Sequence, residues 1–259
     1  MMDFLHDSDR EDLPVNPDDL DEIDGLFFGD DIVPKPPPQK PRRASRIVAL
    51  ISPKGGTGKT SIAVMLAGML STRRRRAAVI DVDPRGSVRR WAHAGDGLPF
   101  PTFAFDATQG AAAFRRAIHA AIVDVDLLVI DTPPAMGPAN ALALQVADLV
   151  LIPAGASNLD LSATKETIAA AQEARHGRAG ELPRVVVVPS RQDSRTRLAR
   201  EFAVRLKQLD VPVAPAIGQR VEVAVAASSG RLVRPSSPAG DEFRRLARYV
   251  WSFLKGLDD

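Results

Sequence analysis

A run of glycines flanked by two lysines and a threonine is the part of the chain best suited to chemistry. Its residues, Lys54-Gly55-Gly56-Thr57-Gly58-Lys59-Thr60, come directly after the apolar stretch 47–51. A strand that feeds such a loop lets backbone N–H groups close around phosphate oxygens. Lys59 would reach the outer phosphates, and the Thr60 hydroxyl would hold Mg²⁺. The sequence therefore predicts a nucleotide-phosphate loop, with contacts that extend to Ser61.

Two details distinguish this loop from a general phosphate loop. Pro53 stands five residues before Gly58, where the general pattern has glycine, and Lys54 adds a second lysine at the front. Because Lys59 already serves the phosphates of one nucleotide, the extra lysine predicts a second role.

Three aspartates follow apolar stretches that read as buried strands. Asp131 ends the stretch 127–130, and we expect it to bind Mg²⁺ directly or through water, together with Thr60. Asp81 and Asp83 alternate at a strand end, so their side chains point to opposite sides and should have different roles. Two alternatives stay open, because aspartates also end strands and cap helices without any metal or catalytic role.

Apolar stretches alternate with helical patterns through most of the chain. The predicted strands cover 46–52, 77–82, 102–105, 126–131, 148–153 and 184–189. The predicted helices cover 58–73, 86–94, 108–122, 138–146, 160–175, 195–208 and 240–256. This alternation predicts an α/β fold, with a doubly wound, mostly parallel sheet flanked by helices. Ligands in such sheets bind at the carboxyl ends of the strands, where Lys59, Asp83 and Asp131 all fall.

Four motifs, in order, resemble those of the ParA/MinD family of ATPases. The glycine-rich loop resembles the deviant Walker A motif of that family, and 81–87, with Trp91 beyond, resembles its second acidic motif in the ParA form. The stretch 127–134 resembles its Walker B strand, and 151–161 resembles the segment after the next strand. Together the motifs place residues 46–257 within the resemblance.

The resemblance implies a P-loop NTPase fold that binds ATP or ADP with Mg²⁺ and hydrolyses ATP weakly until a partner stimulates it. It places Asp81 near the metal and gives Asp83 the task of orienting or activating the attacking water. It assigns Lys54 to the partner's nucleotide in an ATP-bound homodimer, which makes Lys54, Lys59 and Asp83 the catalytic candidates. The clearest departure from the family pattern is Arg85, where ParA proteins usually carry glutamine. This departure bears on the rate of ATP hydrolysis and not on nucleotide binding.

The bulk composition excludes several classes of protein. The 259-residue chain has no cysteine, which excludes disulfides and thiolate metal sites, and its four histidines lack the spacing of metal ligands. No apolar stretch is long enough to span a membrane, and the acidic N-terminus is not a secretory signal. We expect a cytoplasmic protein.

The net charge of +2 hides a strong asymmetry along the chain. Residues 1–31 hold twelve acidic residues and one arginine, a charge of −11, whereas the remainder carries +13. Residues 32–45 contain five prolines. We expect a disordered acidic tail and proline-rich linker over 1–45, and the ATPase domain over 46–259. A basic body implies a polyanionic partner such as nucleic acid, with compositional bias towards arginine as the alternative.

Basic residues in the last third of the chain favour double-stranded DNA as that polyanion. The cluster before and within one helical segment consists of Arg191, Arg195, Arg197 and Arg200, and Arg220 follows a separate short strand. Arg195 and Arg220 resemble the ParA positions that contact DNA of any sequence, and phosphate contacts by arginine need no base readout. A solvated helix face is the alternative. The arginine run 73–76 has an ordinary explanation, since cations favour the C-terminal end of a helix.

The last predicted helix carries an apolar stripe of Phe243, Leu246, Val250, Leu254 and Leu257. Such stripes usually pack onto the body of a protein, which is what we expect here. The alternative is a helix on a membrane surface, formed by 240–257, as in MinD.

The function expected from the resemblance is a partition or positioning ATPase. It would dimerise on ATP, associate with the nucleoid by binding DNA nonspecifically, and move a plasmid, chromosome or other cargo with a ParB-like adaptor. One alternative is a MinD-like, membrane-cycling spatial regulator. Another is a nucleotide-gated interaction module with little turnover.

The charge asymmetry gives the first testable prediction. A tethered polyanion has a high local concentration around a basic body, so the tail should compete with DNA. Deleting residues 1–40 should tighten DNA binding, most clearly at low salt, where screening is weak. Titration of DNA against full-length and truncated protein across ionic strengths measures the effect. Superimposable curves at low salt would leave partner recruitment as the tail's role.

Overall fold

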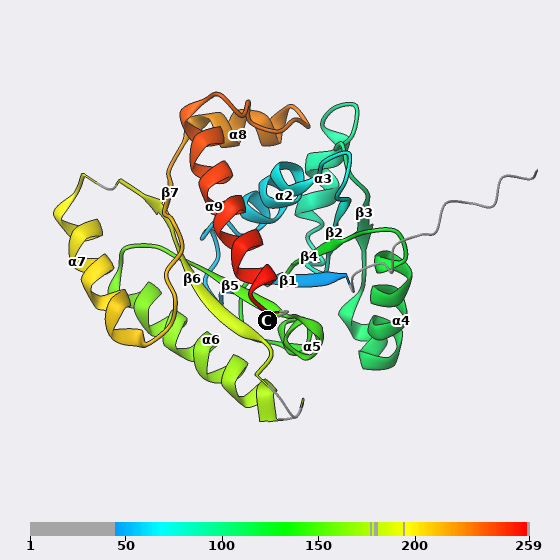
Figure 1. Ribbon diagram of the computed structural model, residues 1–259, viewed down its shortest axis with the longest axis horizontal. Coiled ribbons are helices and arrows are strands. Elements are labelled where there is room, and N and C mark those ends of the chain that lie inside the picture. The colour runs from blue at the N-terminus through cyan, green and yellow to red at the C-terminus, as the bar shows by residue number, and fades with distance from the viewer. Residues whose placement is uncertain (1–44, 177, 179–180, 194, 258–259) are drawn as a thin grey trace, which may run out of the picture. The chain divides into compact units, whose positions relative to one another are not determined.

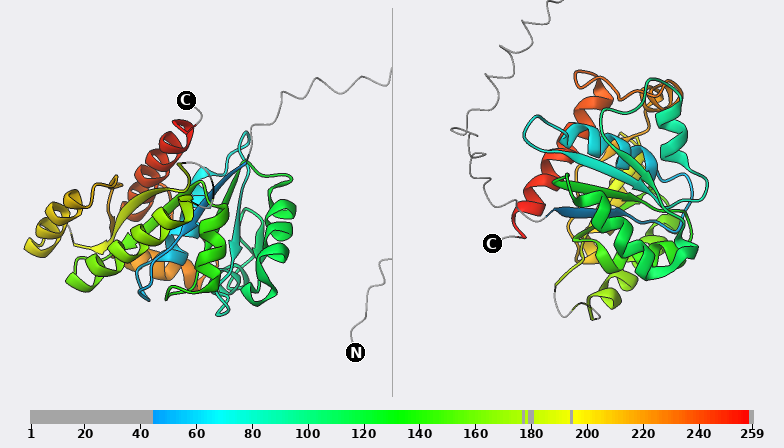
Figure 2. Two further views of the ribbon diagram at one scale, coloured as in Figure 1. Left: turned by 90° about the horizontal axis from the view of Figure 1, so that it is seen from below. Right: turned by 90° about the vertical axis from the view of Figure 1, so that its right-hand side faces the viewer.

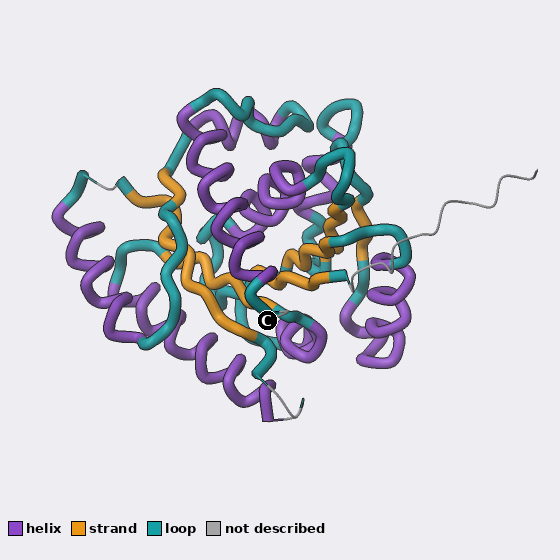
Figure 3. Tube along the Cα trace, viewed as in Figure 1, coloured by secondary structure: helices purple, strands orange, loops and turns teal. Residues whose placement is uncertain are grey.

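The computed structural model describes residues 45–176, 178, 181–193 and 195–257, so the expectations for the tail over 1–44 lie outside the described residues. In the described part, seven strands form one parallel sheet in the order β3-β2-β4-β1-β5-β6-β7 (Figures 1 and 3). The strands are β1 (Arg46–Leu50), β2 (Ala77–Asp81), β3 (Thr102–Ala104), β4 (Leu127–Asp131), β5 (Leu149–Ala154), β6 (Arg184–Gln192) and β7 (Ile217–Gly218).

The strand register brings the expected nucleotide-site residues to one edge of the sheet. Leu50, the last residue of β1, pairs with Asp131 of β4, and Asp131 pairs with Asp81 of β2. Parallel strands present their carboxyl ends at the same edge. The loops that follow β1, β2 and β4 therefore begin side by side.

Helices cover both faces of the sheet (Figures 1 and 2). One face carries α2 (Lys59–Leu70), α3 (Ser87–His93), α8 (Val221–Ser228) and α9 (Pro238–Lys255). The other face carries α4 (Gly110–Ile122), α5 (Pro138–Val146), α6 (Asn158–His176) and α7 (Arg197–Leu206). Two short 3₁₀ turns, Ala107–Gln109 and Lys207–Leu209, precede α4 and follow α7.

The two apolar cores follow from the alternation of side chains along each strand. In β1, Val48 and Leu50 face the core under α2 and α9, whereas Ala49 faces the core under α5 and α6. Strands buried on both faces read as continuous apolar runs, which is why the sequence revealed them. The predicted fold class is confirmed, and each predicted strand is present with its ends displaced by at most three residues.

The predicted helices are also present, and side-chain caps explain where two of them begin. α7 begins at Arg197 because the Thr196 hydroxyl accepts a hydrogen bond from Ala199 N (3.2 Å). α9 begins at Pro238 because the Ser237 hydroxyl accepts one from Gly240 N (3.1 Å). Arg195 consequently lies in the loop before α7.

α8 has no counterpart among the predicted helices. Its sequence, VEVAVAAS, places valine at every second position, a pattern that favours a strand. A tertiary contact supports the helix instead, since the Glu222 side chain accepts a hydrogen bond from Ala239 N at the start of α9 (3.2 Å). Val221 and Val225 are 80% and 58% exposed, and Ala226 is the one residue of α8 that is buried. The apolar residues of α8 therefore do not share one buried face, and the sequence shows no helical periodicity there.

The apolar stripe of α9 faces the sheet and α2. Phe243, Leu246, Val250 and Leu254 are each at most 1% exposed. The expectation that the stripe packs onto the body is confirmed, and the apolar surface that a membrane-bound helix would use is already covered. None of the described helices is long and apolar enough to cross a membrane.

The arginine run 73–76 lies in the turn after α2, which ends at Leu70. Arg75 Nε donates to the Leu70 carbonyl (2.7 Å), and its guanidinium lies 4.0 Å from the centroid of the Trp251 ring. These contacts satisfy a C-terminal carbonyl of α2 and fix α9 against it, which supports the ordinary explanation of the run.

Candidate functional site

The glycine-rich loop joins β1 to α2 and has the backbone shape of a phosphate cradle. Gly56 and Gly58 have φ angles of 74° and 91°, a region that favours glycine. Within the described chain, the backbone N–H groups of 55–60 have no hydrogen-bond acceptor. Ser190 Oγ donates to Thr57 O (2.7 Å) and Arg191 donates to Gly56 O (2.6 Å), so two residues at the end of β6 hold the loop open.

Lys59 lies beneath this loop, at 7% exposure. Its Nζ donates to the carbonyl oxygens of Ser52 (2.9 Å) and Lys54 (3.1 Å). Burial lowers the pKa of Lys59, against the opposing pull of Asp131 and Asp83. Burial removes the water that would stabilise the charge of Lys59, and a phosphate above the loop would stabilise that charge instead.

Asp131 and Thr60 form the part of the site that fits Mg²⁺. Thr60 Oγ1 donates to Asp131 Oδ2 (2.6 Å), whereas the fully buried Oδ1 of Asp131 has no partner among the described residues. Burial is the largest cause that raises the pKa of Asp131 to about 7. Mg²⁺ is usually held by one or two carboxylates together with substrate phosphates, which this donor set matches.

Asp81 lies beside Asp131, but its oxygens are already used by the backbone. Oδ1 accepts a hydrogen bond from Asp83 N (3.0 Å) and Oδ2 accepts one from Val88 N (2.9 Å). Burial raises the pKa of Asp81, and these two hydrogen bonds oppose the rise. Asp81 therefore shapes the loop after β2, and its role as a metal ligand stays a prediction.

Asp83 faces the same space from the loop after β2, and Arg85 binds it. Arg85 Nη2 lies 3.0 Å from Asp83 Oδ2, and Arg85 N lies 3.0 Å from Oδ1. The Asp83 side chain is 5% exposed and that of Arg85 is 59% exposed. The sequence singled out both residues but did not predict their contact.

Lys54 also has a partner within its own chain. Its Nζ lies 2.9 Å from Asp160 Oδ2 and 3.5 Å from Ser157 Oγ, at the start of α6. Asp160 is almost buried and accepts a second hydrogen bond from the Ser157 hydroxyl. Both residues lie in the stretch 151–161 that resembles a family motif, but sequence reasoning assigned neither Asp160 nor Ser157 a role of its own. The expected role of Lys54 in a partner subunit stays a prediction.

One cavity borders the glycine-rich loop and a second lies beside Asp83. The first, of about 350 Å³, is lined by Thr57, Gly58, Ser61 and Arg191, with apolar side chains of α8 and Phe243 behind them. Its position beside the phosphate cradle makes it the candidate for the nucleoside. The other, of about 720 Å³, is lined by Asp83 and the loop that follows β4.

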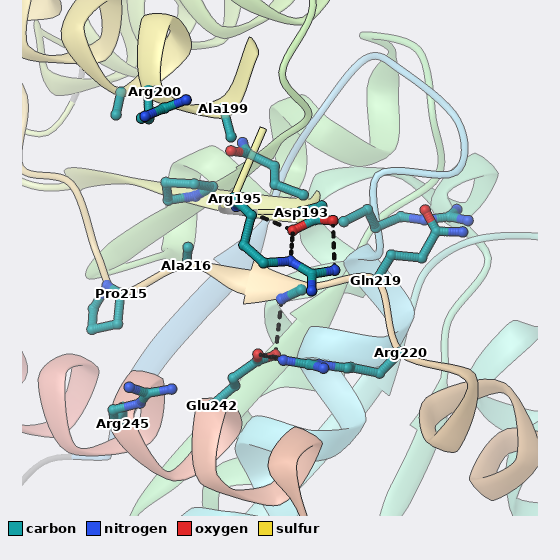
Figure 4. Close-up of a pocket in the computed structure, with 15 residues that line it drawn as sticks. Asp193, Arg195, Ala199, Arg200, Pro215, Ala216, Gln219, Arg220, Glu242 and Arg245 are labelled. Carbon is teal, nitrogen blue, oxygen red and sulfur yellow. Dashed lines mark hydrogen bonds and ion pairs between the residues drawn. The ribbon is translucent and has the colours of Figure 1, made fainter. Parts of the chain in front are cut away.

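A basic groove of about 850 Å³ lies between α7, β7 and α9 (Figure 4). Of the arginines that the sequence singled out, Arg191, Arg195, Arg200 and Arg220 line this groove, and Arg245 of α9 joins them. Arg197 does not line the groove; its guanidinium bonds Glu201 on the same helix (2.6 Å).

Two of the groove arginines are held by carboxylates (Figure 4). Arg195 bonds Asp193 (2.9 Å), and this hydrogen bond lowers the pKa of Asp193 to about 2. Arg220 bonds Glu242 of α9 (2.6 Å), whose other oxygen accepts a hydrogen bond from Gly218 N (2.8 Å). Glu242, nearly buried, thereby fixes the segment that leads from β7 into α8.

The raised pKa of Asp131 predicts that the folded state loses stability as the pH rises. In the unfolded chain this carboxyl ionises near its usual value of about 3.9, whereas in the fold it keeps its proton to about pH 7. The loss therefore develops between these two pKa values. The Asp131→Asn side chain cannot ionise, so the variant should not show this loss. The difference in free energy of unfolding, variant minus parent, should therefore rise by roughly 2–4 kcal/mol between pH 4 and pH 8. Urea unfolding in EDTA without nucleotide measures this, and parallel pH curves would contradict it.

Comparisons with known proteins agree with this geometry. Residues 48–233 match the family described as the CobQ/CobB/MinD/ParA nucleotide binding domain. The chain is 28% identical to the chromosome-partitioning ATPase Soj of Thermus thermophilus over 240 residues, which cover 81% of this chain and 96% of Soj. It is 36% identical to the maintenance of carboxysome distribution protein A of Gloeobacter kilaueensis over 124 residues, 48% of this chain and 55% of that protein.

Solved structures share the fold at lower identity. The septum site-determining protein MinD from Pyrococcus horikoshii, complexed with Mg-ADP, superposes with a TM-score of 0.61 at 18% identity, over 83% of this chain and 99% of that one. The family match extends over most of the described residues and includes the glycine-rich loop, Asp83 and Asp131. The chain therefore belongs to the CobQ/CobB/MinD/ParA family of nucleotide-binding domains.

Proposed function

We propose that this protein is a ParA-type positioning ATPase that moves a plasmid, a chromosome or another large cargo. The observation that carries the proposal is the joint position of the two sites. The cavity at the phosphate loop and the basic groove are both lined by Arg191 and the segment 218–220. The names of two relatives, a chromosome-partitioning ATPase and a carboxysome distribution protein, support a role in positioning cargo.

Hydrolysis of ATP depends on positioning and charge neutralisation more than on covalent chemistry. In the proposed site the backbone N–H groups of 55–60 hold the phosphates, and Lys59 neutralises their charge. Thr60 and Asp131 hold Mg²⁺, which withdraws charge from the phosphates when bound. Asp83 orients the attacking water from its position in the lining of the second cavity.

Dimerisation on ATP would require Lys54 to exchange partners. The Lys54 side chain is 43% exposed while its ammonium group binds Asp160, so the ammonium group can leave that carboxylate for a phosphate of the partner's nucleotide. Because ATP offers a γ-phosphate that ADP lacks, ATP would favour the dimer.

DNA would lie in the basic groove and contact it through phosphates. Arg195 and Arg220 would exchange Asp193 and Glu242 for phosphate oxygens, while Arg200 has no carboxylate partner among the described residues. Such contacts need no base readout, so binding would be independent of sequence. An adaptor of the ParB kind would bring the cargo to this DNA-bound form and stimulate hydrolysis.

The MinD-like alternative lacks a specific supporting observation, since the apolar stripe of α9 is buried in the core. The alternative of an interaction module with little turnover rests on Arg85, which occupies the carboxylate of Asp83. Hydrolysis by the nucleotide-site variants described next tests both the proposal and this alternative.

The nucleotide site gives the next prediction. Lys59→Ala should lower kcat/KM for ATP by at least about a hundredfold, because buried phosphate charge loses its counter-charge. Asp83→Ala should keep ATP binding but lower kcat by about 10²–10⁴-fold. Lys54→Ala should preserve ATP binding by the monomer and weaken the ATP-dependent dimer.

Phosphate release, nucleotide titration and light scattering measure these three effects. Lys165→Ala, which removes an exposed lysine of α6, is the control and should behave as the parent. An Asp83→Ala protein that hydrolyses ATP at the parent rate would remove Asp83 from the mechanism.

The basic groove gives the DNA prediction. Arg195→Glu and Arg220→Gln should each weaken binding of duplex DNA by about tenfold, and should reduce the steepness of its salt dependence by about one phosphate contact. The ATP affinity of the Arg195→Glu protein should not change, because Arg195 does not line the cavity beside the phosphate loop. Arg115→Glu removes an exposed arginine from α4, on the opposite edge of the sheet, and serves as the control. If both groove variants bind DNA like the parent and the control, DNA does not lie in this groove.

A further inference from the structure

Arg85 places its side chain on the carboxylate that the proposed reaction needs. Arg85 Nε lies 3.3 Å from Oδ1 and 3.2 Å from Oδ2 of Asp83, and Nη2 lies 3.0 Å from Oδ2. The backbone N–H of Arg85 also donates to Oδ1, at 3.0 Å. Both oxygens of a nearly buried carboxylate therefore receive donors from one residue.

This arrangement leaves Asp83 little capacity to bind a water molecule. A carboxylate offers about four lone-pair positions, and Arg85 directs three N–H groups at them. A group that orients an attacking water must lie within hydrogen-bond reach of it with a free lone pair. While the ion pair is intact, the lone pairs of the Asp83 carboxylate point at the guanidinium of Arg85 and not at a water molecule.

The two partners differ in their freedom to move. Asp83 is fixed in the loop after β2, where its backbone N–H binds Asp81 and its carbonyl accepts a hydrogen bond from Gly86 N (2.8 Å). The Arg85 side chain is 59% exposed, so it can swing away without opening the core. When the pair opens, Arg85 is the residue that moves.

The phosphate loop and the loop that carries Arg85 begin at the ends of β1 and β2, the two strands that flank β4. Asp81, two residues before Asp83, pairs with Asp131 of β4. Asp131 accepts a hydrogen bond from Thr60 at the end of the phosphate loop (2.6 Å). Guanidinium groups bind phosphate through two parallel hydrogen bonds as readily as they bind carboxylate. Nucleotide phosphates in the cradle would therefore compete with Asp83 for Arg85.

We propose that Arg85 is a positioning residue that holds Asp83 in a two-point ion pair until nucleotide phosphates draw the guanidinium away. The pair opens in only a fraction of the ATP-bound molecules, so Asp83 orients water in that fraction alone and basal kcat is lowered. The inference rests on the proposed function, because it assumes that Asp83 orients the attacking water. A glutamine at position 85 has no charge and could not form this pair.

The test compares steady-state ATP hydrolysis by the full chain and by three variants with Mg²⁺. Arg85→Gln should raise basal kcat by about threefold to tenfold, the range that corresponds to an ion pair of modest strength, with KM for ATP within about twofold of the parent. Arg85→Lys keeps the charge but not the fork, and should lie between the two. Arg89→Gln removes the same charge from an exposed neighbour that has no bond to Asp83, and should match the parent.

A double-mutant cycle separates the restraint from a merely structural effect. In the Asp83→Ala background, Arg85→Gln should leave the residual kcat unchanged, because the group that Arg85 restrains is gone. A rise in kcat that persists in this background would overturn the proposal. So would an unchanged kcat in Arg85→Gln alone, and a lowered kcat would assign Arg85 to stabilisation of the transition state.

Calorimetric titration of the parent with ATP and Mg²⁺ distinguishes failure of the proposed Arg85 restraint from failure of the proposed function. If the parent binds no ATP, the proposed function fails. If it binds and hydrolyses ATP while Arg85→Gln has the parent rate, only the restraint fails. If neither protein hydrolyses the ATP that it binds, both the restraint and the proposed enzymatic activity fail.

Discussion

The burial of Asp131 is the constraint on which the nucleotide site depends. The carboxyl lies at the end of β4, in the middle of the sheet, with one oxygen on Thr60 and the other without a partner in the described chain. Removing a carboxylate from water costs several kcal/mol unless a charge or hydrogen bonds compensate. Lys59, whose charge acts on Asp131, is buried as well, so burial disfavours the charged form of each group. A ligand that brings both a cation and phosphates satisfies the two together.

Four ion pairs within the described chain lie around the two sites. The pairs are Lys54 with Asp160, Arg85 with Asp83, Arg195 with Asp193 and Arg220 with Glu242. In each pair the cation is at least 43% exposed, and in three of them the carboxylate is at most 9% exposed. A polyphosphate or a DNA backbone would therefore exchange one anion for another at each cation. Such exchange lowers affinity for the ligand but keeps the cations oriented in its absence.

The sequence predicted the sheet and the phosphate loop well because their signals are local. Strands buried on both faces give continuous apolar runs, and the positions of Lys59, Thr60 and Asp131 follow from the ends of two such runs. It missed α8, where alternating valines favour a strand and a contact from Glu222 to α9 decides otherwise. It also missed the pairing of Arg85 with Asp83, because rotamers in a loop are set by neighbours that no periodicity encodes.

Tertiary placement also decided which arginines share the groove. Arg197 follows Arg195 by two residues, yet it points to Glu201 along α7, because the Thr196 cap ends the loop and starts the helix between them. Arg245 joins the groove from α9, about fifty residues further along the chain, through the packing of that helix against β7. No sequence spacing connects these positions.

In the proposed function, the segment 218–220 offers a physical route between the nucleotide and DNA. It lines the cavity beside the phosphate loop on one side and the basic groove on the other. Proximity of the two sites does not by itself couple them. Coupling needs a structural element with two arrangements, and each ligand must shift the equilibrium between these arrangements. Arg220 is such an element in the proposed function, because its guanidinium has two possible acceptors, Glu242 and a DNA phosphate. Glu242 also binds Gly218 N, so a change in its bond to Arg220 acts on the backbone that borders the nucleotide. By linkage, nucleotide binding that favours release of Arg220 must itself be favoured by DNA to the same extent.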